Sequence, residues 1–334
     1  MKKIAIIGGG SWGTALAIVL ARSGQSHSVR LWVYEADICE SLRTSRVNEV
    51  FLPGFEVPRE VEVTSDPGEA LRETDIVLGV MPSAYARTTY TRMLPHLEPQ
   101  MAFVSATKGL EPSSHQRMTQ VLTQVVQEKF PTRVAALSGP SFAREVARGD
   151  PTAIVVASAD RELAALVQEE FSGPTFRLYT NDDVTGVELG GAVKNVIAIA
   201  AGVCEGLGFG HNTIAALITR GLAEMTRLAC ALGARPETLA GLAGMGDLVL
   251  TCTGALSRNR TVGVELGKGR RLDDIIGSMR MVAEGVGTTT ATVELARRVR
   301  VEMPISEQMH AVLYQGRAPR DAIRELMERR LKHE

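Results

Sequence analysis

The sequence feature that most constrains the fold is a glycine-rich turn near the start of the chain. A short β-branched run from Ile4 to Ile7 leads into Gly8-x-Gly10-x-x-Gly13, and an apolar helix pattern follows at once. A second apolar run spans Val29 to Tyr34. This strand, turn, helix and strand order is the context in which the glycine spacing indicates a dinucleotide site. The alternative is a glycine turn that binds no ligand.

The three glycines have different expected roles. Gly8 allows the tight turn, Gly10 lets the backbone approach a pyrophosphate, and Gly13 lets the helix pack closely on the strand. The pyrophosphate would lie at the helix N-terminus, where free N–H groups attract anions.

More strand and helix patterns alternate up to about residue 180. Strands are expected at Asp75–Val80, Met101–Ser105, Arg133–Leu137, Thr152–Ala157 and Thr175–Tyr179. The alternation predicts a Rossmann-type, mostly parallel sheet with helices on both faces. Ligands bind at the carboxyl ends of the strands in such sheets. Five residues that follow strand ends are therefore expected in one cleft: Ser11, Ser83, Lys108, Gly139 and Ser141.

The strand patterns stop after about Thr180. Helices are expected at Asn181–Gly206, Asn212–Leu232, Arg258–Gly267, Thr288–Val299 and Ser306–Tyr314. We therefore predict an α/β chain in which a Rossmann-type domain over residues 1–180 precedes an all-helical domain over residues 181–334.

The first of these helices contains the segment ELGGAVKNVIAIAAG, from Glu188 to Gly202. Its small and aliphatic residues predict burial on most sides and close approach of other backbone. Lys194 and Asn195 lie in its middle. A buried lysine is costly, and desolvation lowers its pKa toward the range useful for acid–base chemistry. The alternative is a lysine that reaches water from a helix end.

A second polar group follows later, at Ser257-Arg258-Asn259-Arg260. An arginine at a helix start can bind a phosphate through its guanidinium fork and the helix N-terminus. The alternative is a capped helix start with surface arginines. His211 is a weaker acid–base candidate, because its simplest role is that of a residue near a helix start.

The end of the second strand usually distinguishes NAD from NADP. Here it reads Trp32-Val33-Tyr34-Glu35, with no arginine to pair with a 2′-phosphate. Glu35 can accept a hydrogen bond from a ribose hydroxyl, which favours NAD, and Tyr34 can stack on adenine. The alternative for Glu35 is a solvated loop carboxylate.

Composition excludes several classes of partner. A net charge of -1 gives no indication of nucleic acid or an acidic membrane surface. The four cysteines are widely spaced, so we expect no metal site and a reduced, cytoplasmic compartment. We find no stretch of eighteen apolar residues and expect no membrane span.

Seven motifs occur in an order that resembles a known family. They are GGGSWGTALA, SATKGLE, LSGPSFAREV, ELGGAVKNVIAIAAG, AGMGDLVLTCTG, SRNRTVG and VAEGVGT. Together they look like NAD(P)-dependent glycerol-3-phosphate dehydrogenase, from about residue 3 to about residue 315. The lysine and SRNR motifs are more diagnostic than the glycine turn.

The resemblance implies roles for individual residues. Lys194 would be the proton acceptor, and Lys108 and Asp247 would complete the catalytic group. Lys108 would also reach the cofactor. The remaining cofactor residues would be Gly8, Gly10, Ser11, Trp12, Gly13, Tyr34, Ala143, Arg258, Val282 and Glu284. Substrate would contact Lys108, Gly139, Ser141, Lys194, Asp247, Ser257, Arg258 and Asn259.

The resemblance also implies the reaction: NAD(P)H reduces dihydroxyacetone phosphate to sn-glycerol 3-phosphate, for glycerophospholipid synthesis, in a homodimer. Many bacterial members have an arginine near Tyr34-Glu35, so the departure there leaves the choice between NAD and NADP open. Two alternatives remain. One is a sister two-domain dehydrogenase acting on a β-hydroxyacid or phosphogluconate, and the other is a nicotinamide-sensing protein that signals redox state.

Overall fold

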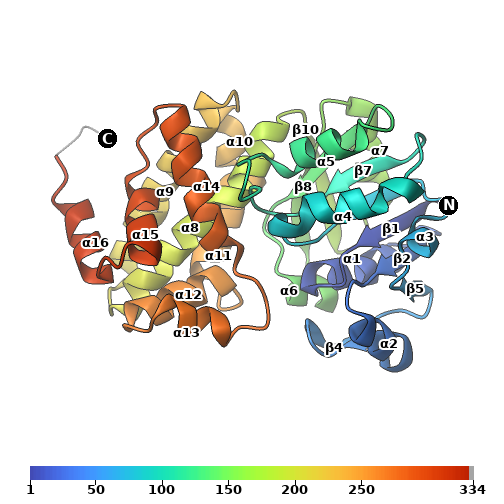
Figure 1. The fold of residues 1–334 in the computed structure, drawn as a ribbon, viewed down its shortest axis with the longest axis horizontal. Coiled ribbons are helices and arrows are strands. Elements are labelled where there is room, and N and C mark those ends of the chain that lie inside the picture. The colour runs from blue at the N-terminus through green and yellow to red at the C-terminus, as the bar shows by residue number, and fades with distance from the viewer. Residues whose placement is uncertain (331–334) are drawn as a thin grey trace.

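A computed structural model describes residues 1–330 and has a sheet part followed by a helical part (Figure 1). The strands are β1 (Lys3–Ile7), β2 (Ser28–Trp32), β3 (Val47–Asn48), β4 (Leu52–Glu56), β5 (Val61–Thr64), β6 (Ile76–Gly79), β7 (Ala102–Ser105), β8 (Arg133–Ser138), β9 (Thr152–Ala157) and β10 (Phe176–Asn181). The helices of this part are α1 (Ser11–Ala21), α2 (Ala36–Ser45), α3 (Pro67–Leu71), α4 (Ala86–Met93), α5 (Met118–Val126), α6 (Ala143–Arg148) and α7 (Arg161–Phe171), with short 3₁₀ turns η1 (Ser83–Tyr85) and η2 (Leu94–His96).

The helical part lies beside the sheet part, and α8 runs from the boundary between them into the helical part (Figure 1). Its helices are α8 (Val184–Gly206), α9 (His211–Ala231), α10 (Pro236–Ala240), α11 (Asp247–Thr253), α12 (Arg258–Gly267), α13 (Leu272–Gly277), α14 (Glu284–Arg298), α15 (Pro304–Tyr314) and α16 (Pro319–Met327), with a π-helical turn η3 (Leu242–Gly246). This confirms the predicted fold class. The last four residues of the expected helical domain, 331–334, lie outside the described residues.

The main sheet has the order β10-β9-β8-β7-β6-β1-β2-β5. Neighbouring strands are parallel except β8 and β9, which are antiparallel, so β9 and β10 run against the rest. The sheet is thus mostly parallel, as predicted. The strands that precede Ser11, Ser83, Lys108 and Gly139 all belong to the parallel set, so their carboxyl ends share one edge.

Alternate residues of the central strand face opposite helical layers. Ile4 and Ile6 of β1 pack in the core cluster that contains α1, α6 and α7. Ala5 and Ile7 pack in the cluster that contains α3, α4 and α5. Because successive side chains of a strand point to opposite faces, a strand covered on both faces is apolar throughout. This explains the continuous apolar run that predicted β1.

The glycine turn has the geometry that its spacing predicts. Gly8 has φ +127°, a conformation that side chains rarely adopt. A Cβ at Gly13 would lie 1.9 Å from the Gly8 carbonyl oxygen, so only glycine lets α1 start so close to β1. A Cβ at Gly10 would meet nothing within 4 Å, so the space in front of the turn is open.

The core of the helical part is α8, which α9, α11, α12, α14 and α15 surround. A Cβ at Gly202 would lie 2.0 Å from the Arg260 carbonyl oxygen, which confirms that small residues admit other backbone. By length and composition α8 is the helix among residues 1–330 that could cross a membrane, with a mean hydropathy of 1.5. The sequence count missed this property. However, its apolar window is 100% buried in the protein, as in the core helix of a soluble protein.

Several boundaries differ from the prediction for local reasons. The first long helix starts at Val184 rather than Asn181, because the Asp183 side chain caps it by accepting a hydrogen bond from Gly186 N. β10 continues to Asn181 through its pairing with β9. The sequence reading missed short elements that give little periodic signal: β3, β4, β5, η3, α10, α11, α13 and α16.

Candidate active site

Lys194 lies in the middle of α8 and is only 4% exposed. Its ammonium group donates to the Asp247 carboxylate, and it also donates to Thr251 Oγ1 at 2.8 Å. Asp247 begins α11 and is 1% exposed, and Thr251 lies one turn further along the same helix. Lys194 therefore does not reach water from a helix end. The interpretation of Lys194 as a buried lysine is confirmed.

A second lysine reaches the same carboxylate from the sheet part. Lys108 follows β7, and its Nζ lies 2.9 Å from Asp247 Oδ2. The same ammonium group donates to the Gly139 carbonyl oxygen at 2.7 Å and to Ser141 Oγ at 3.3 Å. Gly139 has φ +144°, and a Cβ there would lie 2.9 Å from Ile154 Cα. The turn after β8 therefore requires glycine to present this carbonyl.

The two lysines share one counter-ion, and this sets the acid–base properties of the group. Burial lowers the pKa of Lys194 from its usual value to about 7. The Asp247 carboxylate opposes this shift, and the positive charge of Lys108 adds to it. An amine with a pKa near neutrality can both donate and accept a proton under physiological conditions.

The SRNR segment forms the start of α12. Ser257 caps the helix by accepting a hydrogen bond from Arg260 N at 3.2 Å, which is the capping role that the sequence left open. Arg258 donates to the Val282 carbonyl oxygen at 2.8 Å. Its side chain is exposed, yet the protein around it lowers its pKa through desolvation, which the Glu284 carboxylate partly offsets. A guanidinium group in this situation suits an anionic ligand.

The Asn259 side chain makes hydrogen bonds within the protein that the sequence did not indicate. Its Oδ1 accepts a hydrogen bond from Gly285 N at 2.9 Å, and its Nδ2 donates to Asn195 Oδ1 at 2.9 Å. The Asn259 side chain is 8% exposed. It therefore joins α8, α12 and the start of α14, and one amide hydrogen is left for a ligand.

The start of α1 offers free donors beside the open space at Gly10. No side chain caps this helix, so its first N–H groups can face an anion. Ser11 donates to the Phe51 carbonyl oxygen at 2.6 Å and lies 3.2 Å from Met281 Sδ. Trp12 packs against Phe176, and its buried Nε1 has no partner. The uncapped backbone N–H groups fit the pyrophosphate of a dinucleotide.

A contact between Ser83 and Glu284 also joins the two parts of the chain. The Glu284 carboxylate accepts hydrogen bonds from Ser83 N at 3.0 Å and from Ser83 Oγ at 2.5 Å. Burial raises the pKa of Glu284, and the bonds from Ser83 and the charge of Arg258 oppose the shift. Val282 is 47% exposed beside it.

Two other candidate residues lie at helix starts. Ala143 begins α6 and packs on the sheet core. His211 begins α9 and is exposed.

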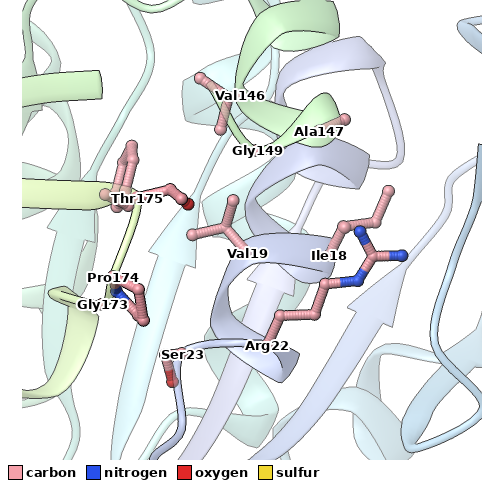
Figure 2. Close-up of a pocket in the computed structure, with 11 residues that line it drawn as sticks. Ile18, Val19, Arg22, Ser23, Val146, Ala147, Gly149, Gly173, Pro174 and Thr175 are labelled. Atoms are coloured by element: carbon pink, nitrogen blue, oxygen red, sulfur yellow. The ribbon is translucent and has the colours of Figure 1, made fainter. Parts of the chain in front are cut away.

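A separate pocket lies along α1, between its second half and the segment that precedes β10 (Figure 2). Val19 and Val146 face each other across it, and Arg22 and Ser23 lie at the end of α1. None of the residues around Asp247 lines this pocket. It is therefore not part of the lysine site.

Comparisons with known proteins identify the family. Residues 3–164 match the model of the NAD-dependent glycerol-3-phosphate dehydrogenase N-terminus, and residues 183–324 match that of its C-terminus. A protein from Koribacter versatilis named glycerol-3-phosphate dehydrogenase (NAD(P)+) is 62% identical over 330 residues, covering 98% of both chains. One of the same name from Citrifermentans bemidjiense is 54% identical, covering 100% of this chain and 99% of that one.

A solved structure agrees with these relatives. The crystal structure of glycerol-3-phosphate dehydrogenase from Coxiella burnetii is 41% identical and superposes with a TM-score of 0.93, covering 98% of this chain and 99% of that one.

The chain belongs to the glycerol-3-phosphate dehydrogenase family.

Members of this family are oxidoreductases that use NAD(P), and neither alternative from the sequence has comparable support. The structure brings together the predicted Lys108, Gly139, Ser141, Lys194 and Asp247. Ser83 lies next to this group, because a Cβ at Gly109 would meet Ser83 Oγ at 2.8 Å, and it binds Glu284. Ser11 lies beside Met281, which belongs to the same segment as Glu284.

The sequence reading gave no role to Thr251, which binds Lys194. Its spacing of four residues after Asp247 places both on one face of a helix, and that was the available signal.

Proposed function

We propose that this chain catalyses the reversible reduction of dihydroxyacetone phosphate to sn-glycerol 3-phosphate with NADH or NADPH. The observation that carries the proposal is the buried Lys194, which shares the Asp247 carboxylate with Lys108. This arrangement holds an exchangeable proton and a second positive charge on the same carboxylate. It suits a reaction in which a carbonyl oxygen becomes an alkoxide and takes up a proton.

The turn from Gly8 to Gly13 would hold the cofactor, with Ser11 and Trp12 at the pyrophosphate. When bound, the reduced nicotinamide supplies the hydride that the carbonyl carbon of the substrate accepts. Val282, Glu284 and Ala143 would line the remainder of the cofactor site, and Tyr34 would lie at its adenosine end. The absence of a side-chain cap on α1 and the open space at Gly10 support this arrangement.

Lys194 would supply the proton in the reduction. As the carbonyl carbon gains a hydride, the oxygen gains negative charge and takes a proton from the Lys194 ammonium. The lysine is left neutral beside Asp247 and regains a proton from solvent. In the oxidation, neutral Lys194 takes the hydroxyl proton as the hydride leaves. Lys108 would stabilise the negative oxygen, and Thr251 would hold the Lys194 nitrogen in position.

The phosphate of the substrate would bind at the start of α12, on Arg258 and the remaining amide hydrogen of Asn259. Gly139, Ser141 and Ser257 would complete the substrate site. The exposed guanidinium group at the start of α12 supports this assignment, because its fork and the helix N-terminus can both bind an anion.

We further propose that residues 1–180 form the cofactor domain and residues 181–334 the substrate domain. We also propose that the protein is a cytoplasmic homodimer whose product supplies glycerophospholipid synthesis. The free cysteines Cys39, Cys204, Cys230 and Cys252 support a reducing compartment.

The deciding experiment follows the loss of reduced nicotinamide absorbance with dihydroxyacetone phosphate, using NADH and NADPH in parallel. We expect turnover in the wild type and a loss of roughly 10²–10⁴-fold in kcat for Lys194→Ala, since this is the usual contribution of one acid–base group. The variant should still bind the cofactor. Undiminished turnover in Lys194→Ala would overturn the mechanism, and no turnover in the wild type would overturn the function.

A further inference from the structure

The surface at the end of β2 carries an aromatic ring with a cation on it. Tyr34 follows β2 and is 66% exposed. The guanidinium carbon of Arg92, from the last turn of α4, lies 5.7 Å from the centre of the Tyr34 ring. The Trp32 ring meets Tyr34 edge-on, with ring centres 6.0 Å apart. Tyr34 is thus held between the sheet and an arginine from a distant helix.

The Arg92 guanidinium group makes no other polar contact among the described residues. Its side chain is exposed, and within residues 1–330 it has neither an ion pair nor a hydrogen bond. The other arginine of this helix, Arg87, is engaged with the Glu111 carboxylate through both Nε and Nη2, at 2.8 Å each. Arg92 therefore keeps all five guanidinium donors free at the end of β2.

The end of β2 is where a dinucleotide-binding sheet recognises the adenosine ribose. A carboxylate there accepts hydrogen bonds from the ribose hydroxyls, whereas a nearby arginine accommodates a 2′-phosphate. Glu35 provides the carboxylate: it is exposed and its side chain does not cap α2. The strand end itself has no arginine, but the contact with Tyr34 brings one to the same place from α4.

We propose that Arg92 binds the 2′-phosphate of NADPH and that Arg92 and Glu35 together set the cofactor preference of this chain. Arg92 favours the phosphorylated ribose through a charge-assisted fork, and Glu35 favours the free hydroxyl. The two residues act in opposite directions at one site, which gives a protein that accepts both cofactors. The inference rests on the proposed function for its kinetic consequence only.

The test separates nucleotide recognition from turnover. Calorimetry measures the binding of adenosine 2′,5′-bisphosphate and of adenosine 5′-monophosphate to the full chain. Arg92→Ala should lower the affinity for the bisphosphate roughly tenfold or more and change the affinity for the monophosphate by less than about twofold. The affinity of Arg92→Lys for the bisphosphate should lie between those of the wild type and Arg92→Ala, because lysine keeps the charge and loses the fork. Glu35→Gln should change the ratio of bisphosphate to monophosphate affinity in the opposite direction.

The matched control is Arg298→Ala, which removes an exposed arginine from the last turn of α14, in the helical part. It should leave both affinities unchanged. The same variants are then assayed with NADPH and NADH, and only the NADPH kcat/KM should fall in Arg92→Ala.

Equal losses for both nucleotides in Arg92→Ala would overturn the proposal, since Arg92 would then act on the adenine or on Tyr34. Unchanged affinity of Arg92→Ala for the bisphosphate would overturn it as well. A protein whose binding ratio moves as expected, but which does not reduce dihydroxyacetone phosphate, would sustain the assignment of Arg92 and sink the proposed function alone.

Discussion

Lys194 shows how a single residue can be buried and remain chemically useful. Removing an ammonium group from water disfavours its charged form, and Asp247 restores part of that loss. An unshared carboxylate would hold the proton on the lysine more strongly. Because Lys108 takes the second oxygen of Asp247, the carboxylate is divided between two cations and the Lys194 proton stays exchangeable.

The two directions of the reaction should therefore have opposite pH dependence. Reduction needs protonated Lys194, so its kcat/KM should decline as pH rises through the pKa of about 7. Oxidation needs the neutral amine, so its kcat/KM should rise through the same range and level off above it. The residual activity of Lys194→Ala serves as the control, because it retains the titration of the substrate phosphate. Parallel profiles in both directions would contradict the assignment.

In the proposed function, Arg258 contributes to substrate affinity rather than to the chemical step. Arg258→Ala removes a charge-assisted fork, and we expect the KM for dihydroxyacetone phosphate to rise roughly 10–100-fold with a smaller change in kcat. Steady-state kinetics at saturating cofactor measure this. Arg298→Ala again controls for the loss of one exposed positive charge. A fall in kcat at constant KM would contradict this role and would indicate that Arg258 acts on the reacting atoms instead of the phosphate.

At the scale of elements, the contact between α8 and α12 depends on glycines on both helices. A Cβ at Gly202 would lie 2.0 Å from the Arg260 carbonyl oxygen. A Cβ at Gly263 of α12 would lie 2.0 Å from the Ile199 carbonyl oxygen. The two backbones are therefore in direct contact. This contact fixes Arg258, at the start of α12, relative to Lys194 on α8.

Gly202→Ala should lower the free energy of unfolding by about 1–3 kcal/mol, because the added methyl group must push the helices apart. Gly287→Ala is the matched control: Gly287 lies inside α14, is exposed, and a Cβ there meets nothing within 4 Å. It should stabilise the protein by up to ~1 kcal/mol through helix propensity. Urea unfolding measures both, and equal effects would contradict the packing argument.

The sequence predicts the elements that have strong local patterns and misses those defined by tertiary contacts. β1, α1 and α12 follow from glycine turns, apolar runs and a capping serine. The reversed direction of β9 has no local signal, because an apolar strand reads the same in either direction. For the same reason, Arg92 was missed: its proximity to Tyr34 depends on how α4 packs, which the residues around Arg92 do not encode.

At the scale of the whole molecule, Asp247 joins the sheet part and the helical part through one carboxylate. It binds Lys108, which follows β7, and Lys194 of α8. The proposed catalytic group therefore forms only where the two parts meet. The sequence identified these three residues because each lies in a distinctive motif, whereas their sharing of one carboxylate required the structure.

Asp247→Asn should destabilise the protein most at low pH. Without the carboxylate, burial lowers the folded-state pKa of Lys194 further below its unfolded value. The unfolded chain then binds more protons than the folded one, so the free energy of unfolding should increase as pH rises from 6 to 9. We expect a loss of roughly 3–5 kcal/mol at the low end. Urea unfolding at several pH values measures it, and a pH-independent loss would contradict the shared counter-ion.

The complete burial of α8 also has a consequence for biosynthesis. This helix leaves the ribosome before α12 and α14, which cover it, have been made. At ordinary elongation rates the wait for α14 is on the order of 5–20 s. During that interval the nascent chain presents a helix with the length and hydropathy of a membrane anchor. The helix that contains the proposed catalytic lysine thus lacks part of its cover at the stage when chaperones and the membrane-insertion machinery meet nascent chains.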